Sequence, residues 1–176
     1  AKVIVKNGVG LESWLDDTLE SSGTSAVVVD ASEGVTLREG GHEDHATGAK
    51  ATGATGAAAV HDHDDEAHDP HIWHDPKNAK VMVAGIAQAF AAADPAGAAT
   101  YQKNLAAYTA ELDTLDTELA TTFGALPNKK LVTNHDAFGY LVGAYDLEFV
   151  GSIIPSFDTS AELSAADLKD LVAAIK

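Results

Sequence analysis

The run from Tyr101 to Phe123 restricts the fold more than any other feature of this sequence. Large apolar residues recur there at intervals of three and four: Tyr101, Leu105, Tyr108, Leu112, Leu115, Leu119 and Phe123. With a start signal at Asp94-Pro95 and a stop at Gly124, this spacing predicts one helix of roughly 30 residues, about 43 Å long. Such a helix either bridges two lobes or forms a coiled-coil seam. We favour the bridge, because no other segment carries a comparable stripe.

Short apolar runs on both sides of this helix predict two β–α–β units. Before it, a strand, a helix and a strand are expected at residues 3–5, 11–23 and 26–30. After it, they are expected at 131–133, 137–145 and 148–154, followed by a last helix. Parallel strands need helical crossovers of this kind. The expected fold class is therefore α/β, with two small lobes of parallel sheet and flanking helices joined by one long rigid helix.

These elements divide the chain into three parts. Residues 1–93 are expected to form part of an N-terminal α/β lobe, residues 94–124 the linking helix, and residues 125–176 part of a C-terminal α/β lobe. Residues from about 32 to 68 lack apolar periodicity, so they bury too little surface to offset their ordering entropy and are expected to form a mobile loop. The chain starts inside a strand-like run and stops inside a helical pattern. We therefore expect a fragment of a longer protein.

Seven of the eight histidines lie between His42 and His74. Five of them alternate with Asp and Glu in the expected loop: His42, His45, His61, His63 and His68. Neutral imidazole is the commonest protein ligand for zinc, and carboxylates can complete the shell. A flexible tract of this kind would bind divalent metal weakly and release it quickly. An exposed polar loop of biased composition is the alternative; irregular spacing and an internal position argue against a purification tag.

His71 and His135 are the histidines in ordered sequence context. His71 lies between Pro70 and Pro76, each of which disfavours helical geometry in the residue before it, so we expect a rigid extended segment leading into a helix capped by Asp75. Such a segment suits a single presented ligand. His135 comes after a strand, where the carboxyl ends of an α/β sheet position ligands. The alternative is a histidine that caps the following helix.

Composition limits the function further. The net charge of −16, from 11 basic and 27 acidic residues, argues against nucleic acid or an anionic membrane surface as a partner. It is compatible with attracting cations, although acidic surfaces also serve solubility alone. The chain has no cysteine, which excludes disulfides and thiolate metal sites. No run of about 18 apolar residues is present that could span a membrane. The pattern favours a metal-binding protein rather than an enzyme.

Four segments occur in an order that resembles a known family. They are residues 7–12 (Asn-Gly-Val-Gly-Leu-Glu) followed by Trp14-Leu15, the His-rich acidic loop, residues 69–76 (Asp-Pro-His-Ile-Trp-His-Asp-Pro) before the long helix, and residues 134–140 (Asn-His-Asp-Ala-Phe-Gly-Tyr). Together they resemble the zinc/manganese substrate-binding proteins of metal ABC importers, and the resemblance covers essentially the whole chain.

The resemblance implies a metal ion held in a cleft between two lobes, with one ligand from each of four segments. The family's histidines in the two motifs fall on His71 and His135. Histidine rather than glutamate at the second position is typical of the zinc-selective branch, as is the His-rich loop, which is thought to help collect zinc. Imidazole also suits zinc better than manganese, which prefers oxygen ligands. His74 stands where the family usually has an apolar residue, and we do not assign it to the site.

The resemblance also implies what lies outside the chain and where the protein works. The family's first histidine lies upstream, and the last strands of the second lobe, with a possible carboxylate ligand, would follow Lys176. The implied function is high-affinity zinc capture outside the cytoplasm, by a periplasmic or lipid-anchored protein, and delivery to the membrane permease. A manganese- or iron-binding importer subunit is the nearest alternative.

Two alternatives belong to other classes. A zinc buffer or chaperone would bind metal mainly through the loop. A metallohydrolase could use His135-Asp136, a dipeptide found in one family of metal-dependent phosphohydrolases, to hold a metal that activates water. That family is all-helical, whereas strand signals flank the dipeptide here.

Overall fold

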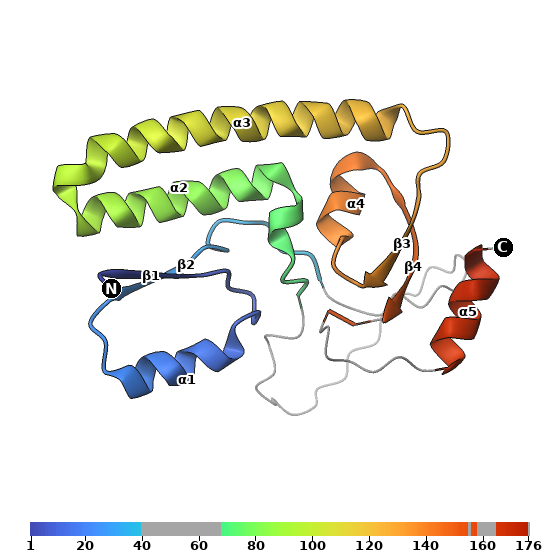
Figure 1. Cartoon of the computed structure of the whole chain (residues 1–176), viewed down its shortest axis with the longest axis horizontal. Coiled ribbons are helices and arrows are strands. Elements are labelled where there is room, and N and C mark those ends of the chain that lie inside the picture. Colours follow the sequence, from blue (N-terminus) through green and yellow to red (C-terminus); the bar gives the residue numbers. More distant parts are fainter. Residues whose placement is uncertain (40–67, 155, 158–164, 176) are drawn as a thin grey trace, which may run out of the picture.

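The computed structural model describes residues 1–39, 68–154, 156–157 and 165–175. The first sheet contains β1 (Val3–Lys6) and β2 (Val27–Asp30), which pair in parallel and are connected by α1 (Ser13–Ser22). Gly23 ends α1 in the left-handed conformation, with φ of 59°, which glycine adopts without strain. The first predicted β–α–β unit is confirmed (Figure 1).

The second sheet repeats this arrangement. The strands β3 (Lys130–His135) and β4 (Glu148–Ile154) pair in parallel around α4 (Gly139–Tyr145), and α5 (Ala165–Ile175) contacts β4. This confirms the second unit. It also confirms the α/β class, with small parallel sheets flanked by helices (Figure 1).

Two helices pack together beside the first sheet, and only the shorter of them contacts its strands. The shorter, α2 (Pro76–Ala93), begins as predicted: the Asp75 carboxylate accepts a hydrogen bond of 2.8 Å from the backbone N–H of Lys77. The longer, α3 (Ala98–Gly124), packs along α2 (Figure 1). The sequence analysis did not predict this pairing, because α2 carries no apolar stripe as long as that of α3.

The long helix also reaches the second lobe. Its far end contacts α4, where the hydroxyl of Tyr145 donates a hydrogen bond of 2.9 Å to Asp116. Its start differs from the prediction: the 3₁₀ turn η3 (Pro95–Gly97) comes before it, and the Asp94 carboxylate accepts from the hydroxyl of Tyr101 instead of capping the helix. A helix of 27 residues that contacts both lobes is the expected bridge.

Residues 40–67, which contain most of the predicted mobile loop and four of its histidines, lie outside the described residues. At the edges of this gap, Glu39 and His68 form an antiparallel bridge. Among the described residues, no helix combines the length and apolar character needed to cross a membrane.

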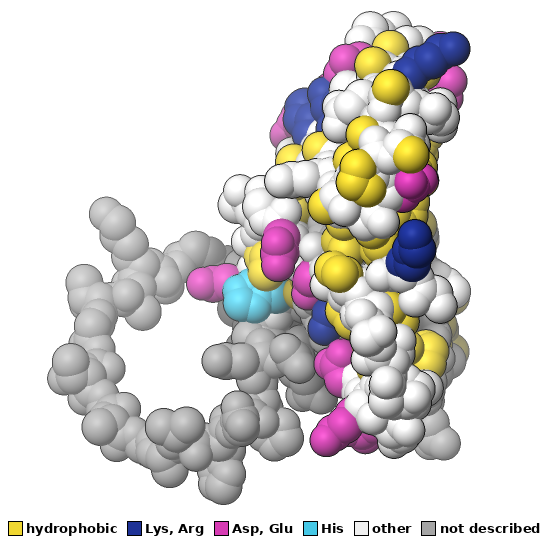
Figure 2. All heavy atoms as spheres, turned by 90° about the vertical axis from the view of Figure 1, so that its left-hand side faces the viewer, with side chains coloured by type: hydrophobic (Ala, Val, Ile, Leu, Met, Phe, Trp, Pro, Cys, Tyr) yellow, Lys and Arg dark blue, Asp and Glu magenta, His cyan; other side chains and the backbone are white. Residues whose placement is uncertain are grey.

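Buried side chains concentrate where the lobes meet. Ile72, in the 3₁₀ turn η2 (Ile72–His74), is fully buried, and η2 contacts both α2 and α4. Ala137 and Tyr140, before and in α4, are also buried. Elsewhere large apolar residues remain exposed, such as Trp14 at 66%, and Figure 2 shows hydrophobic side chains scattered among charged ones on one face. The junction of the two lobes is therefore the best-packed part of the described chain.

Candidate metal centre

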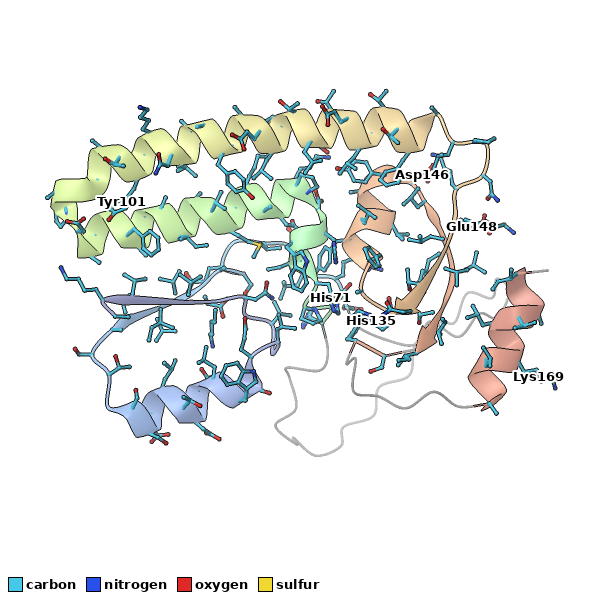
Figure 3. All side chains as sticks on the ribbon, in the orientation of Figure 1. His71, Tyr101, His135, Asp146, Glu148 and Lys169 are labelled. Carbon is cyan, nitrogen blue, oxygen red and sulfur yellow. The ribbon has the colours of Figure 1, made fainter. Side chains whose placement is uncertain are left out.

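The structure brings His71 and His135 together from opposite lobes. His71 lies just before η2, and His135 is the last residue of β3. Their ring centroids are 5.3 Å apart, with an interplanar angle of 64° (Figure 3). A zinc ion about 2 Å from a nitrogen of each ring, at a tetrahedral angle, would separate the ring centres by roughly 5 Å. The spacing therefore fits two imidazoles that share one ion.

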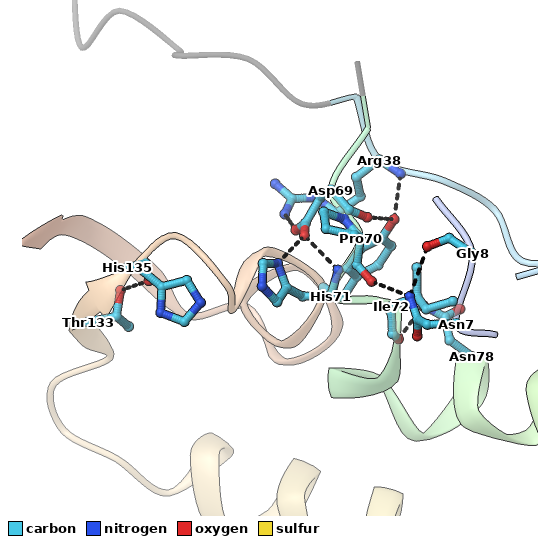
Figure 4. A network of polar contacts seen from close by, with 11 residues as sticks. Asn7, Gly8, Arg38, Asp69, Pro70, His71, Ile72, Asn78, Thr133 and His135 are labelled. Atoms are coloured by element: carbon cyan, nitrogen blue, oxygen red, sulfur yellow. Dashed lines mark hydrogen bonds and ion pairs between the residues drawn. The ribbon is translucent and has the colours of Figure 1, made fainter. Parts of the chain in front are cut away.

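His71 is held by the residue two positions before it. The carboxylate of Asp69 accepts hydrogen bonds at Oδ1 from the backbone N–H of His71 at 2.9 Å and from its ring Nδ1 at 2.8 Å (Figure 4). Both side chains are buried. A carboxylate only accepts hydrogen bonds, so Nδ1 carries the hydrogen and the lone pair of Nε2 stays free for a metal.

The segment around His71 is tied to the first sheet. The side-chain amide of Asn7 donates a hydrogen bond of 2.9 Å to the carbonyl of Pro70. The Glu12 carboxylate accepts from the backbone N–H groups of Asn7 and Gly8. Gly8 has φ of 87°, and a Cβ there would overlap the Asp30 carboxylate, so glycine is required. The motif of residues 7–12 thus fixes the segment that carries His71.

The expected extended geometry of this segment is wrong at η2. Asp75 is extended before Pro76, with φ of −105° and ψ of 119°, as proline requires. Ile72–His74, however, form a 3₁₀ turn. A proline restricts the residue directly before it, so Pro70 and Pro76 leave these three residues free to turn. The turn places His71 and His74 on the same side, with ring centroids 6.5 Å apart.

His135 is held less firmly than His71. Its side chain is half-buried, and its ring Nδ1 lies 3.0 Å from the amide oxygen of the neighbouring Asn134. It does not cap the following helix: Phe138 occupies that position, and no side chain caps the helix there. The helix-capping interpretation is therefore wrong, and the ring faces the site from the carboxyl end of β3.

The sequence analysis gave no role in zinc capture to four residues around this pair. They are Asp69, Arg38, Asp136 and Tyr140. Burial raises the pKa of the Asp136 carboxyl above its ordinary value, and the charge of Asp69 raises it further. The Asp-Pro-His and His-Asp-Ala-Phe-Gly-Tyr motifs contained three of these residues, but their contacts join segments far apart in the chain. Arg38, inside the expected loop of residues 32–68, carried no signal.

No third ligand is present in the described part of the chain, where no group of three or more His, Cys, Asp or Glu residues is placed to hold a metal ion. Of the loop histidines, His68 lies in the bridge with Glu39; His42, His45, His61 and His63 fall in the gap between residues 39 and 68. The described chain thus supplies two converging imidazoles.

His74 is a third imidazole beside the pair, 4.5 Å from the ring of Phe138. Burial lowers the pKa of His74 below its ordinary value, and the positive charges of His71 and His135 lower it further, while Asp69 opposes this. In the unfolded chain the ring takes up a proton near the ordinary value of about 6.5. As the pH falls through this value, the unfolded state binds a proton at His74 more readily than the folded state does. The contribution of His74 to the stability of the folded protein therefore declines.

We therefore expect the His74→Leu variant to lose less stability than the natural chain between pH 7.5 and pH 5.5. The measurement is urea unfolding of the metal-free full-length protein at both values. A variant that loses as much stability as the natural chain, or more, would show that His74 does not have a lowered pKa.

The whole chain, residues 1–176, matches the family described as zinc-uptake complex component A, periplasmic (ZnuA). The high-affinity zinc uptake system protein ZnuA of Bacillus subtilis is 34% identical over 172 residues, which cover 97% of this chain and 50% of that protein. The zinc-binding lipoprotein AdcA of Streptococcus pneumoniae is 31% identical over 181 residues, covering 100% of this chain and 33% of that protein. The chain therefore spans half or less of the length of these relatives.

Solved structures agree with the sequence match. The periplasmic zinc-binding protein TroA from Treponema pallidum superposes with a TM-score of 0.77 at 27% identity, over 99% of this chain and 56% of that one. The two parallel sheets and the long helix are those that the residue pattern predicted. This chain belongs to the family of the periplasmic component A of zinc-uptake complexes.

Proposed function

We propose that this chain is part of the zinc-binding component of an ABC importer, and that His71 and His135 are two of its zinc ligands. The observation that carries the proposal is the meeting of these imidazoles from opposite lobes, 5.3 Å apart, with Nε2 of His71 left free by Asp69. In this arrangement an ion bound by both rings holds the two lobes together.

Zinc is the proposed ion because both ligands on this chain are imidazoles. Imidazole suits zinc, whereas manganese prefers sites richer in oxygen. Relatives named for zinc uptake and zinc binding support this choice. The manganese or iron alternative requires that ligands from elsewhere in the complete protein be mostly oxygens.

The proposed role is capture and delivery without catalysis. The complete protein would work outside the cytoplasm, as the family description indicates, either free in the periplasm or anchored by lipid as in the lipoprotein AdcA. Its partner would be the membrane permease of the importer. We propose the same three parts as above: residues 1–93 and 125–176 as parts of two lobes, and residues 94–124 as the link.

The geometry does not favour the hydrolase alternative. The phosphohydrolases that share the His-Asp dipeptide are all-helical, whereas His135 ends a strand of a parallel sheet. The long helix contacts both lobes and would limit large hinge motion. Zinc release would then depend on small shifts near the ligands. His135 is the ligand better able to shift, because its ring pairs with the neighbouring Asn134, whereas the His71 ring is hydrogen-bonded to the buried carboxylate of Asp69.

Deleting residues 41–66 separates zinc capture in the cleft from a buffer that acts through the loop. We expect the deletion variant of the full-length protein to keep tight one-to-one zinc binding, with a Kd changed less than about tenfold, equivalent to about 1.4 kcal/mol. The measurement is a competition titration against a chelator of known affinity. If tight binding disappears with the loop, the buffer alternative is correct and the cleft proposal fails.

A further inference from the structure

Asp69 is the most deeply buried charged group of the described chain, with 1% of its surface exposed. A buried carboxylate is costly unless it is paired with an opposite charge and hydrogen-bonded. Here Oδ1 accepts both hydrogen bonds from His71, and Oδ2 pairs with Nη1 of Arg38 at 3.3 Å. The guanidinium is partly exposed, so the carboxylate is the member of the pair that the fold buries.

The backbone around this carboxylate is anchored in the second lobe. The hydroxyl of Tyr140 donates to the carbonyl of Asp69 and accepts from the backbone N–H of Arg38, each at 3.0 Å. Burial raises the pKa of the Tyr140 hydroxyl, so it keeps the proton that it donates. Because Tyr140 belongs to α4, the position of Asp69 is fixed relative to the lobe that also carries His135.

Gly139 allows this approach. A Cβ at this position would coincide with the guanidinium of Arg38 and lie 2.7 Å from Oδ2 of Asp69. The ion pair therefore rests directly on the backbone at the start of α4. The last two residues of the motif at 134–140 serve this contact between the lobes, and neither is a metal ligand.

We propose that Asp69 is a positioning residue for zinc capture, which holds His71 as the Nδ1–H tautomer and is itself held by Arg38 and Tyr140. The proposal rests on the proposed function for its role in binding, but the tautomer is a property of the metal-free protein. A carboxylate that accepts from the second nitrogen of a ligating histidine fixes the ring and raises its basicity. Removing such a partner typically lowers metal affinity about 10- to 100-fold.

Asp69→Asn is the most informative substitution, because it keeps the shape of the side chain and replaces one acceptor oxygen with an NH₂ donor. If the amide oxygen faces His71, the NH₂ group opposes the donor of Arg38. If it faces Arg38, the NH₂ group opposes the backbone N–H of His71 and forces the ring Nδ1 to accept. Neither orientation satisfies both neighbours, and a neutral amide oxygen attracts the ring N–H less strongly than a carboxylate does. The preference of His71 for the Nδ1–H tautomer is therefore weakened. Asp94→Asn is the matched control, since that carboxylate accepts from Tyr101 at the far end of the helical pair (Figure 3).

The first measurement is long-range ¹H–¹⁵N correlation NMR of histidine-labelled, metal-free full-length protein, which distinguishes the two neutral tautomers. We expect His71 to be the Nδ1–H tautomer in the natural chain and in Asp94→Asn, and the Nε2–H tautomer to become populated beside it in Asp69→Asn. Zinc titration should then show a Kd weaker by about 10- to 100-fold for Asp69→Asn alone. A purely structural role would lower stability without changing the tautomer.

The proposal is overturned if His71 of the natural chain is the Nε2–H tautomer, a result that needs no variant and so does not depend on folding of Asp69→Asn. It is also overturned if Asp69→Asn keeps both the tautomer and the affinity. Failure of the proposed function has a different result: the natural chain would bind no zinc at His71, while the tautomer would still respond to Asp69.

Discussion

Replacing His71 with Ala is expected to weaken zinc binding by the full-length protein by at least about 100-fold. Structural zinc sites with four ligands bind with about 10–16 kcal/mol, or roughly 3 kcal/mol for each ligand, and every 1.4 kcal/mol is tenfold in Kd. His71 is buried and held by Asp69, so the variant loses a ligand that the metal-free protein already holds in position. Competition titration against a chelator measures the change.

Two further variants test whether the loss of zinc affinity is specific to the proposed ligands. His135→Ala is expected to lose a similar amount, because it removes the ligand from the other lobe. His74→Leu removes an imidazole from the same turn as His71 and is expected to change the Kd less than about tenfold, or 1.4 kcal/mol. If His74→Leu instead weakened binding as much as His71→Ala did, the assignment of ligands would be wrong.

The second large effect concerns stability. Ile72→Ala is expected to lower the free energy of unfolding by about 2–5 kcal/mol, the usual cost of truncating a fully buried isoleucine. Ile72 has no exposed surface, and its turn packs between α2 and α4, so neither lobe alone can collapse to fill the cavity. Urea unfolding of the metal-free protein gives the measurement.

Ile153→Ala is the matched control, since this isoleucine is 39% exposed on β4. Its truncation is expected to cost less than about 1.5 kcal/mol, because much of the side chain is already in water. Equal costs for the two variants would mean that the junction between the lobes is not the packed centre that the structure indicates.

The sequence predicted the elements well, because each carried a local signal. The apolar run of β1, the end of α1 at Gly23, the Asp75-Pro76 start of α2 and the long stripe of α3 all depend on neighbouring residues. The turn at Ile72–His74 and the pairing of α3 with α2 were missed. Both depend on packing between distant segments, which periodicity within one segment does not report.

The same distinction holds for the site. The pattern of residues singled out His71 and His135, and the structure brings them together. The residue pattern did not reveal the hydrogen bonds that hold the segment of His71 in place, because Tyr140 lies 71 positions from Asp69 and 102 from Arg38. Asp69 was visible in its motif, but a carboxylate beside a proline is also an ordinary turn residue. Only the fold shows that it faces the ring.

Tyr140 and Tyr145 attach the second lobe at two separate points, one to Asp69 and Arg38 and the other to Asp116 on α3. Both attachments belong to α4, and the chain itself joins α3 to β3. Any opening of the site that preserves these hydrogen bonds must leave α4 in place. His135, at the end of β3, would then move away from His71 through a shift of the end of β3 relative to α4, and a metal ion at the two rings would oppose that shift.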